Sequence, residues 1–233
     1  MLCMRRIKKH LQIATKNAKG LFKQSEYAPK YIHSNVPYFS QWESRDLVEL
    51  IITMQLDGKD DPKWADSGAA SKDEYAEWSW NGCGVACLKM ILAATQDKVV
   101  PLAQLGKKAT TYGVYKMPLH SSPGMFYKPF VTFIEKEFGL NGKAESALTI
   151  SEIKQTISKG GYVIVSVTPE IRFSSKKPSK KGGHLVLVYG YDDRDKVLYL
   201  HNPSGFEGAQ ENVTLSESSF MQFFDHKGII VFA

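Results

Sequence analysis

Residues 80–92 read Trp80-Asn81-Gly82-Cys83-Gly84-Val85-Ala86-Cys87-Leu88-Lys89-Met90-Ile91-Leu92, which predicts a turn that opens directly into a buried helix. Asn81 and Gly82 favour the turn, and the apolar residues from Val85 onward suit a helix packed on several sides. Cys83 is therefore expected at a helix N-terminus, where free N–H groups and the helix dipole should lower the pKa of its thiol. Cys87, one turn further on, is expected in the core. Small buried thiols are common core residues, so this stretch alone leaves Cys83 open to a structural or a catalytic role.

The composition fits a globular protein with one large domain or two small ones. The chain has 233 residues, of which 43% are hydrophobic, enough to build a sizeable core. Its three cysteines have no regular spacing, which argues against a disulfide framework and for at least one free thiol. The formal net charge of +6 would favour anionic partners without identifying one.

The N-terminal region is interpreted as an extension, residues 1–30, in front of a main domain, residues 31–233. Apolar residues recur at helical spacing over residues 4–22, among lysines, which predicts a basic amphipathic helix followed by a linker over residues 20–30. The helix would either pack against the domain with a solvated lysine face or make peripheral contact with a membrane surface or a partner. No apolar run has transmembrane length and no signal peptide is evident, so the expected compartment is the cytoplasm, with non-classical export left open.

The rest of the chain predicts an α+β domain with a helical N-terminal half and a mostly antiparallel sheet in its C-terminal half. Ser44 could cap a helix, and residues 42–79 are interpreted as a probable insertion. Residues 101–124 are expected to be rich in loops because of their prolines and glycines. Helices are expected over residues 126–138 and 150–157, and strands over residues 162–167, 184–191, 197–201 and 228–232.

Two further side chains could complete a nucleophilic site with Cys83. A cysteine nucleophile needs a base to take its proton and a third group to hold that base in the correct tautomer. His184 opens an expected strand directly after Gly182 and Gly183, so it can face a cleft while its strand stays rigid. Asn202 follows the next strand, and antiparallel pairing would bring it alongside His184. A histidine at a strand start and an asparagine before proline are each also common without any catalytic role.

The chain order of Cys83, His184 and Asn202 is that of papain-like enzymes. More narrowly, the chain resembles the double-glycine-leader, or bacteriocin-processing, family of cysteine peptidases over about residues 36–232. The resemblance implies a papain-like fold and a standalone peptidase, without the transporter domains of the best-known relatives. It is carried by four segments: Val36-Pro37-Tyr38-Phe39-Ser40-Gln41, residues 81–92 quoted above, Gly182-Gly183-His184-Leu185-Val186-Leu187-Val188-Tyr189-Gly190-Tyr191-Asp192, and Tyr199-Leu200-His201-Asn202-Pro203-Ser204-Gly205.

The resemblance also suggests a donor for the oxyanion of the reaction. In the family a glutamine upstream of the cysteine has this role, and here the matching residue is Gln41, whose amide would act with the backbone N–H of Cys83. In classical members that glutamine lies only a few residues before the cysteine, whereas here residues 42–79 intervene and Glu77 occupies roughly the classical position. An ionised glutamate cannot donate a hydrogen bond. The third member of the triad is commonly aspartate in the family, and Asn202 is the papain-like choice.

The implied reaction is hydrolysis of an amide bond in a peptide or protein substrate. Cys83 would attack the acyl carbon, His184 would take the thiol proton and later protonate the leaving group, and water would resolve the thioester. The lysine-rich residues 174–183 precede His184 and would either form a cationic lip that favours acidic substrates or simply keep a loop soluble. Catalysis of this kind needs no cofactor and no metal.

Several other functions fit the same residues. The chain could be a catalytically silent papain-like binding module, or a thiol enzyme acting on another bond, such as a peptidoglycan amidase or a transpeptidase. A zinc site from Cys83, Cys87, His184 and His201 is a weaker alternative, since the cysteine spacing is not a usual zinc motif. A nucleic-acid partner is not expected, because positive charge without a recognition motif is the sole support for one.

Overall fold

The computed structural model describes residues 2–23, 27–121, 123–173, 178 and 181–233. Its sheet has the strand order β2-β7-β3-β4-β5-β6, with β1 paired to β4, and the pairs are antiparallel. The strands are β1 (Lys30–Ile32), β2 (Asn141–Glu145), β3 (Tyr162–Val167), β4 (His184–Asp192), β5 (Val197–His201), β6 (Val213–Ser216) and β7 (Phe224–Phe232). The helices are α1 (Leu2–Lys23), α2 (Val48–Ile52), α3 (Lys72–Asn81), α4 (Cys83–Gln96), α5 (Leu102–Thr111), α6 (Tyr127–Phe138), α7 (Ile150–Ser158) and α8 (Glu217–Phe223).

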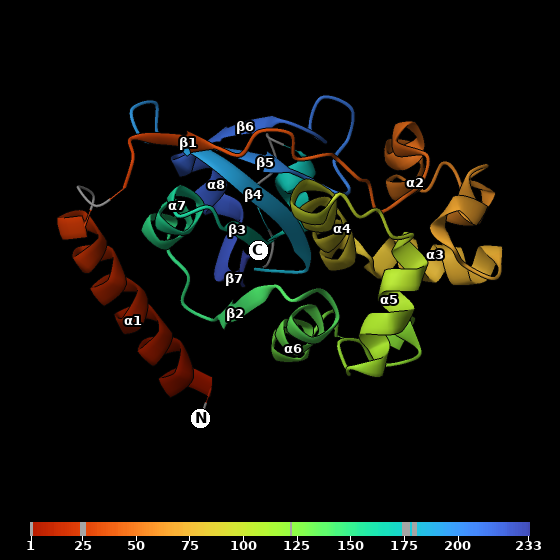
Figure 1. Ribbon diagram of the computed structural model, residues 1–233, viewed down its shortest axis with the longest axis horizontal. Coiled ribbons are helices and arrows are strands. Elements are labelled where there is room, and N and C mark those ends of the chain that lie inside the picture. The colour runs from red at the N-terminus through yellow and green to blue at the C-terminus, as the bar shows by residue number, and fades with distance from the viewer. Residues whose placement is uncertain (1, 24–26, 122, 174–177, 179–180) are drawn as a thin grey trace.

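The sheet lies between two groups of helices. Figure 1 shows α4 beside β4, with α2, α3 and α5 beyond it, and α7 and α1 on the opposite side of the sheet. Successive residues of β3 alternate between two cores: Ile164 packs with α4, α5 and α6, whereas Val163 and Val165 pack with α7 and α8. This alternation follows from the two-residue period of a strand. Because both faces of β3 and β4 are buried, their apolar runs are almost continuous in sequence.

Most of the expected elements are present, and the α+β class is confirmed. The four expected strands correspond to β3, β4, β5 and β7, and the helices expected over residues 126–138 and 150–157 correspond to α6 and α7. Gly139 ends α6 in the left-handed region, and Thr149 begins α7 with a capping box, as their positions predict. The short strands β1, β2 and β6 and the helices α3 and α8 were not expected. The strands and α8 are too short to show a clear period in sequence, and α3 lies mostly in the stretch that was interpreted as an insertion.

The expectation of a loop-rich segment over residues 101–124 is wrong in its first part, where α5 forms. Leu102, Leu105 and Ala109 are buried on one face of this helix, spaced as in an amphipathic helix. The glycine at its centre obscured the pattern. Gly106 is required there because a Cβ atom would lie 2.3 Å from the ring of Trp78.

Residues 42–79 contribute most of a small separate core. Trp42, Val48, Ile51 and Tyr75 pack together with Phe206, which comes from the loop between β5 and β6. The expectation that Ser44 caps a helix is wrong, because its hydroxyl donates instead to Asp61 Oδ1 over 2.6 Å and no side-chain cap is made. The division of the chain into an extension, a domain and an insertion remains a prediction.

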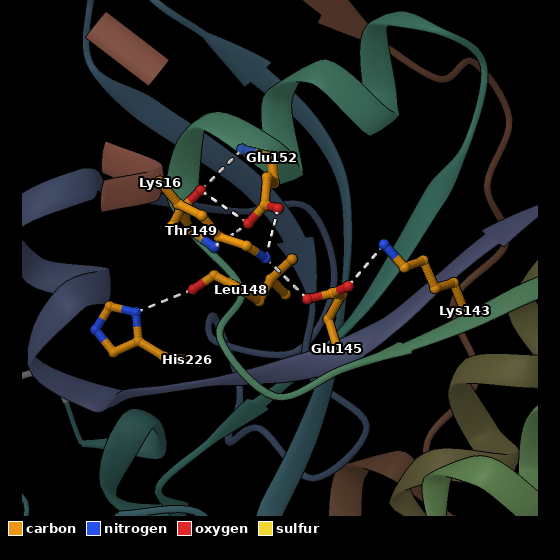
Figure 2. Close-up of polar contacts among 7 residues, drawn as sticks. All are labelled: Lys16, Lys143, Glu145, Leu148, Thr149, Glu152 and His226. Carbon is orange, nitrogen blue, oxygen red and sulfur yellow. Dashed lines mark hydrogen bonds and ion pairs between the residues drawn. The ribbon is translucent and has the colours of Figure 1, made fainter. Parts of the chain in front are cut away.

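Charged side chains hold α1 against the domain. Lys16 Nζ lies 2.9 Å from Glu145 Oε2 and 2.8 Å from Glu152 Oε1, and Figure 2 shows it between these two carboxylates. Lys9 Nζ donates to the carbonyl oxygen of Asp225 over 2.8 Å. Glu152 also accepts from the backbone N–H of Thr149, so one carboxylate both caps α7 and binds α1.

The expected solvated lysine face is therefore wrong for Lys9 and Lys16. They lie on the same side of α1 as Ile13, which is 8% exposed, whereas Ile7 and Leu11 are 54% and 63% exposed. Lys9 and Lys16 face the domain because carboxylates on its surface form ion pairs with them, on the side of α1 where apolar contacts were expected. The helix continues to Lys23, beyond the expected start of the linker, and residues 24–26 of that linker lie outside the described residues. None of the helices on the described residues has the length and apolar character needed to traverse a bilayer.

Candidate active site

Cys83 is the first residue of α4, as the sequence predicts. Helix α3 ends at Asn81, and Gly82 joins the two helices. A Cβ atom on Gly82 would lie 2.7 Å from the backbone carbonyl oxygen of Trp78, so the close passage from α3 to α4 needs glycine. Buried residues from Gly84 to Leu92 anchor α4 in the core, and the Cys83 side chain is partly exposed at its start.

Cys87 lies one turn into α4 and is fully buried, as predicted. Its Sγ lies 3.9 Å from the carbonyl oxygen of Leu185. Both Cys83 and Cys87 are free thiols, in agreement with the expectation of at least one.

His184 is the first residue of β4 and is buried. Gly182 and Gly183 precede it with φ angles of 75° and 101°, a region that side chains other than glycine rarely adopt. The pairing of Val167 with His184 ties the strand start to β3. The imidazole is therefore held by a rigid strand, and the chain can enter that strand in this conformation because two glycines precede it.

Asn202 is hydrogen-bonded to the imidazole of His184. Its Oδ1 lies 2.7 Å from His184 Nε2, and the backbone N–H of Ser204 donates to the same oxygen over 3.2 Å. Because Oδ1 accepts from the Ser204 N–H, it must also accept from His184, so Nε2 carries the proton. The neutral ring then has its lone pair on Nδ1, which makes no hydrogen bond among the described residues.

A cavity of about 290 Å³ brings Cys83 and His184 together. Its lining includes the start of α4 and the start of β4. The lining residues are Trp80, Asn81, Cys83, Pro123, Gly124, Met125, Tyr127, Ser166, Gly183, His184 and Leu185. A thiol and an imidazole that face one cavity are the two groups that covalent acyl transfer requires.

The segment carrying Gln41 packs directly against the turn that carries Asn202. The N–H of Gln41 donates to the carbonyl oxygen of Pro203 over 2.8 Å, and Tyr38 Oη donates to the carbonyl oxygen of Asn202 over 3.1 Å. Gly205 closes this turn, where a Cβ atom would lie 1.8 Å from the carbonyl oxygen of Ala209. Two of the segments quoted from the sequence are thus in contact.

Comparison with protein families places the chain in a known family. A model of the Peptidase_C39 like family matches residues 33–227, a range that contains Gln41, Cys83, His184 and Asn202. The chain belongs to the Peptidase_C39 like family. The resemblance seen in the sequence is thereby confirmed.

A solved structure supports the fold of this Peptidase_C39 like protein. The crystal structure of a candidate C39-like peptidase from Bacillus anthracis matches it with a TM-score of 0.52 and 17% identity, over 88% of this chain and 98% of the other. At this identity the likeness concerns the fold alone. No curated protein sequence matches the chain.

The electrostatics of the thiol differ from the sequence expectation. Burial raises the pKa of Cys83, although a hydrogen bond to the backbone of Leu185 and the positive charge of Arg172 oppose the shift. The predicted lowering by the helix N-terminus is therefore wrong, because desolvation outweighs the favourable backbone groups.

The pKa of the His184 imidazole is shifted in the opposite direction to that of the thiol. Burial, reinforced by the charge of Arg172, lowers the pKa of His184 to about 3, against the hydrogen bond with Asn202. A raised thiol pKa and a lowered imidazole pKa mean that both groups of this Peptidase_C39 like site are neutral near pH 7 in the ligand-free state.

Gln41 is buried against the C-terminal part of α3 and is not among the residues that line the cavity. Its Nε2 donates to the carbonyl oxygen of Ser79 over 2.7 Å, and its Oε1 is buried with no hydrogen-bond partner among the described residues. Glu77, at the classical position of the family glutamine, instead lies 3.3 Å from His120 Nδ1 and lines a neighbouring cavity. The role of Gln41 as oxyanion donor remains a prediction.

The residues proposed for the zinc alternative are engaged elsewhere. Both ring nitrogens of His201 are used, since Nε2 donates to the carbonyl oxygen of Val36 and Nδ1 accepts from the N–H of Asn212. Over the part of the chain that the structure describes, no group of three or more His, Cys, Asp or Glu side chains is placed to hold a metal ion.

Two residues near the site carried no signal in the sequence. Arg172 follows β3 in a 3₁₀ turn, and Ser204 was quoted in a motif without a role. The Ser204 hydroxyl lies 3.1 Å from His184 Nε2, and Arg172 hydrogen-bonds to that hydroxyl. An isolated arginine between strands shows no pattern, so only tertiary contacts could reveal it. Residues 174–177 and 179–180 of the expected cationic lip lie outside the described residues.

Proposed function

We propose that this protein is a cysteine peptidase that cleaves an amide bond in a peptide or protein substrate through an acyl-enzyme on Cys83. The observation that carries the proposal is the cavity that Cys83 and His184 both line, together with the hydrogen bond from His184 Nε2–H to Asn202. The family membership of the chain supports the same function.

The proposed reaction begins from the neutral pair. His184 Nδ1 takes the Sγ proton as the sulfur bonds to the substrate carbonyl carbon, and the carbonyl becomes an oxyanion. The N–H of Cys83 and the second amide N–H of Gln41 are the proposed oxyanion donors. His184 then returns the proton to the amine as the C–N bond breaks. Water, deprotonated by His184, attacks the thioester and releases the carboxylic acid and the thiol.

Two finer features of the substrate and the partners are proposed on weaker support. The lysine-rich residues 174–183 precede His184, which favours substrates with acidic side chains near the scissile bond. Residues 4–22 are proposed to make peripheral contact with an anionic membrane, since Ile7 and Leu11 are exposed beside Lys8. Cosedimentation with anionic vesicles, compared for Leu11→Ser and the unchanged protein, tests the second proposal. The cytoplasmic compartment remains a prediction.

The test of the main proposal is cleavage of a diverse peptide library, with product sites assigned by mass spectrometry. Cys83→Ala should abolish cleavage, and trapping with a peptide acyloxymethyl ketone should add one label to Cys83 in the unchanged protein. Cys87→Ala is the matched control, because it removes a thiol from the same helix outside the cavity. Cleavage that survives Cys83→Ala would refute the proposal.

The main alternatives appear as distinct outcomes of the same experiment. A silent binding module would retain peptides without cleaving or being labelled. A transpeptidase would transfer the acyl group to an added amine in preference to water, and a peptidoglycan amidase would cleave muropeptides but no ordinary peptide in the library.

A further inference from the structure

Arg172 makes a forked set of hydrogen bonds to Ser204. Its Nε donates to the Ser204 carbonyl oxygen over 2.7 Å and to the Ser204 hydroxyl over 2.9 Å, and its Nη2 donates to the same hydroxyl over 2.5 Å. Nη1 lies 3.4 Å from the carbonyl oxygen of Pro169. The planar guanidinium is suited to several parallel bonds of this kind. The fork fixes both the backbone and the side chain of Ser204.

Ser204 in turn contacts both members of the orienting pair. Its hydroxyl lies 3.1 Å from His184 Nε2, and its N–H donates to Asn202 Oδ1 over 3.2 Å. Ser204 itself is fully buried. The network therefore runs without interruption from Arg172 through Ser204 to His184 and Asn202.

Arg172 is also the charged group that acts on the reacting pair, among the side chains that the structure describes. Its charge acts on both Cys83 and His184. On the described residues, the other titratable groups that interact with Cys83 are Cys87, Tyr115 and Tyr127, and burial raises the pKa of all three, so they are neutral near pH 7.

Arg172 keeps its charge despite its surroundings. Burial lowers its pKa to about 10, while Cys83 and Glu170 oppose the shift. In papain-like sites with an aspartate, a negatively charged carboxylate is hydrogen-bonded to the histidine. Here the histidine has a neutral asparagine and a nearby cation, which favours a neutral imidazole and a negative sulfur or oxyanion.

We propose that Arg172 is a positioning residue of this site, which holds Ser204 and Asn202 against His184 and presents a positive charge to the Cys83–His184 pair. The inference rests on the proposed function for its catalytic meaning. The placement of Arg172 and its charge can be tested without any substrate.

The test is the rate of Cys83 alkylation by iodoacetamide at pH 9, assigned by mass spectrometry. Arg172→Met removes charge and donors, Arg172→Lys keeps the charge without the fork, and Arg194→Met removes an equal charge from an exposed turn. We expect Arg172→Met to react about tenfold more slowly, since a nearby cation shifts a pKa by about one unit or more. Arg172→Lys should stay within about threefold of the unchanged protein, and Arg194→Met should match it. Equal rates in Arg172→Met and the unchanged protein, or equally slow Arg172→Lys and Arg172→Met, would overturn the proposal.

A second variant separates the positioning role of Arg172 from the effect of its charge. It also replaces Arg172→Met as the test if that variant does not fold. Ser204→Ala removes the hydroxyl shared by Arg172 and His184 but leaves the arginine. We expect unchanged alkylation of Cys83 within about threefold and faster solvent exchange of the His184 Nε2 proton, measured by NMR. An unchanged exchange rate would overturn the positional part of the proposal.

The role of Arg172 can also be tested if the proposed peptidase function is wrong. If the unchanged protein cleaves no peptide, the His184 imidazole still reports on Arg172 by ¹⁵N NMR. In Arg172→Met the ring should titrate at least about one pH unit higher than in the unchanged protein, because a like charge has been removed. A ring that titrates at the same pH would overturn the inference, whatever the protein catalyses.

Discussion

The imidazole of His184 donates from Nε2 to Asn202 Oδ1 over 2.7 Å, although the two residues lie 18 positions apart in the chain. The antiparallel pairing of β4 with β5 sets this relationship, since Leu187 is paired with His201. The start of one strand and the end of the next therefore meet. The hydrogen bond fixes which ring nitrogen carries the proton and leaves the lone pair on Nδ1.

Loss of Asn202 should weaken catalysis through the wrong tautomer. We expect Asn202→Ala to reduce peptide cleavage at least about tenfold, because the imidazole would no longer be held with its lone pair on Nδ1. Asn202→Asp should retain activity but move the acid limb of its pH profile upward by about one unit or more, since a carboxylate raises the imidazole pKa. The exposed Asn141→Ala is the control. An acid limb at the same pH in Asn202→Asp would contradict the argument.

The buried imidazole should make stability fall in acid. The pKa of His184 is about 3 in the folded protein, against 6.5 for an unperturbed histidine, so the unfolded chain binds the extra proton between these values. The contribution of His184 to the free energy of unfolding is complete above pH 6.5. Below that pH it decreases by up to about 1.4 kcal/mol per pH unit. Urea unfolding from pH 7.5 to 4.5 should show a shallower pH slope for His184→Gln than for the unchanged protein. His120→Gln removes an exposed histidine as a control, and equal slopes for the three proteins would refute the prediction.

Gly82→Ala should disturb the start of α4. The added Cβ would lie 2.7 Å from the Trp78 carbonyl oxygen in α3 and 2.9 Å from a Leu102 methyl group in α5. Either the backbone at the start of α4 or these neighbouring groups must therefore shift. We expect a loss of about 1–3 kcal/mol in the free energy of unfolding, as for other overpacked sites, together with altered alkylation of Cys83. In Gly113→Ala the added atom meets nothing within 4 Å and only the positive φ is strained, so the alkylation rate should not change. If both variants alkylate at the unchanged rate, the steric argument is wrong.

Lys16 should hold α1 in place through its two carboxylate partners. Burial lowers the pKa of Lys16, but the hydrogen bonds that its ammonium donates to Glu152 and Glu145 outweigh this and raise it, so Lys16 is charged at any pH near neutrality. We expect Lys16→Met to increase amide hydrogen exchange in residues 7–19 severalfold, and high salt to have a similar effect on the unchanged protein. Lys19→Met is the matched control, because Lys19 lies on the exposed side of the same helix. Equal exchange in the two variants would show that other contacts hold α1.

The sequence revealed elements whose signals are local. The strands β3, β4, β5 and β7 and the helices α6 and α7 follow from period, caps and turn residues within a few positions. Elements that depend on distant partners were missed, such as α5, whose central Gly106 makes sense only against Trp78. The same limit explains Ser44, which binds Asp61 in place of a helix end.

By itself the sequence determined the α+β class, the position of Cys83 at a helix start, and the chain order that links Cys83, His184 and Asn202. These properties follow from residue types in short segments. Tertiary structure alone decided that both reacting groups are neutral, that Gln41 is bound to Ser79, and that Arg172 reaches Ser204. The reason is that desolvation and charge act through space, and the groups that exert them come from parts of the chain that no sequence period connects.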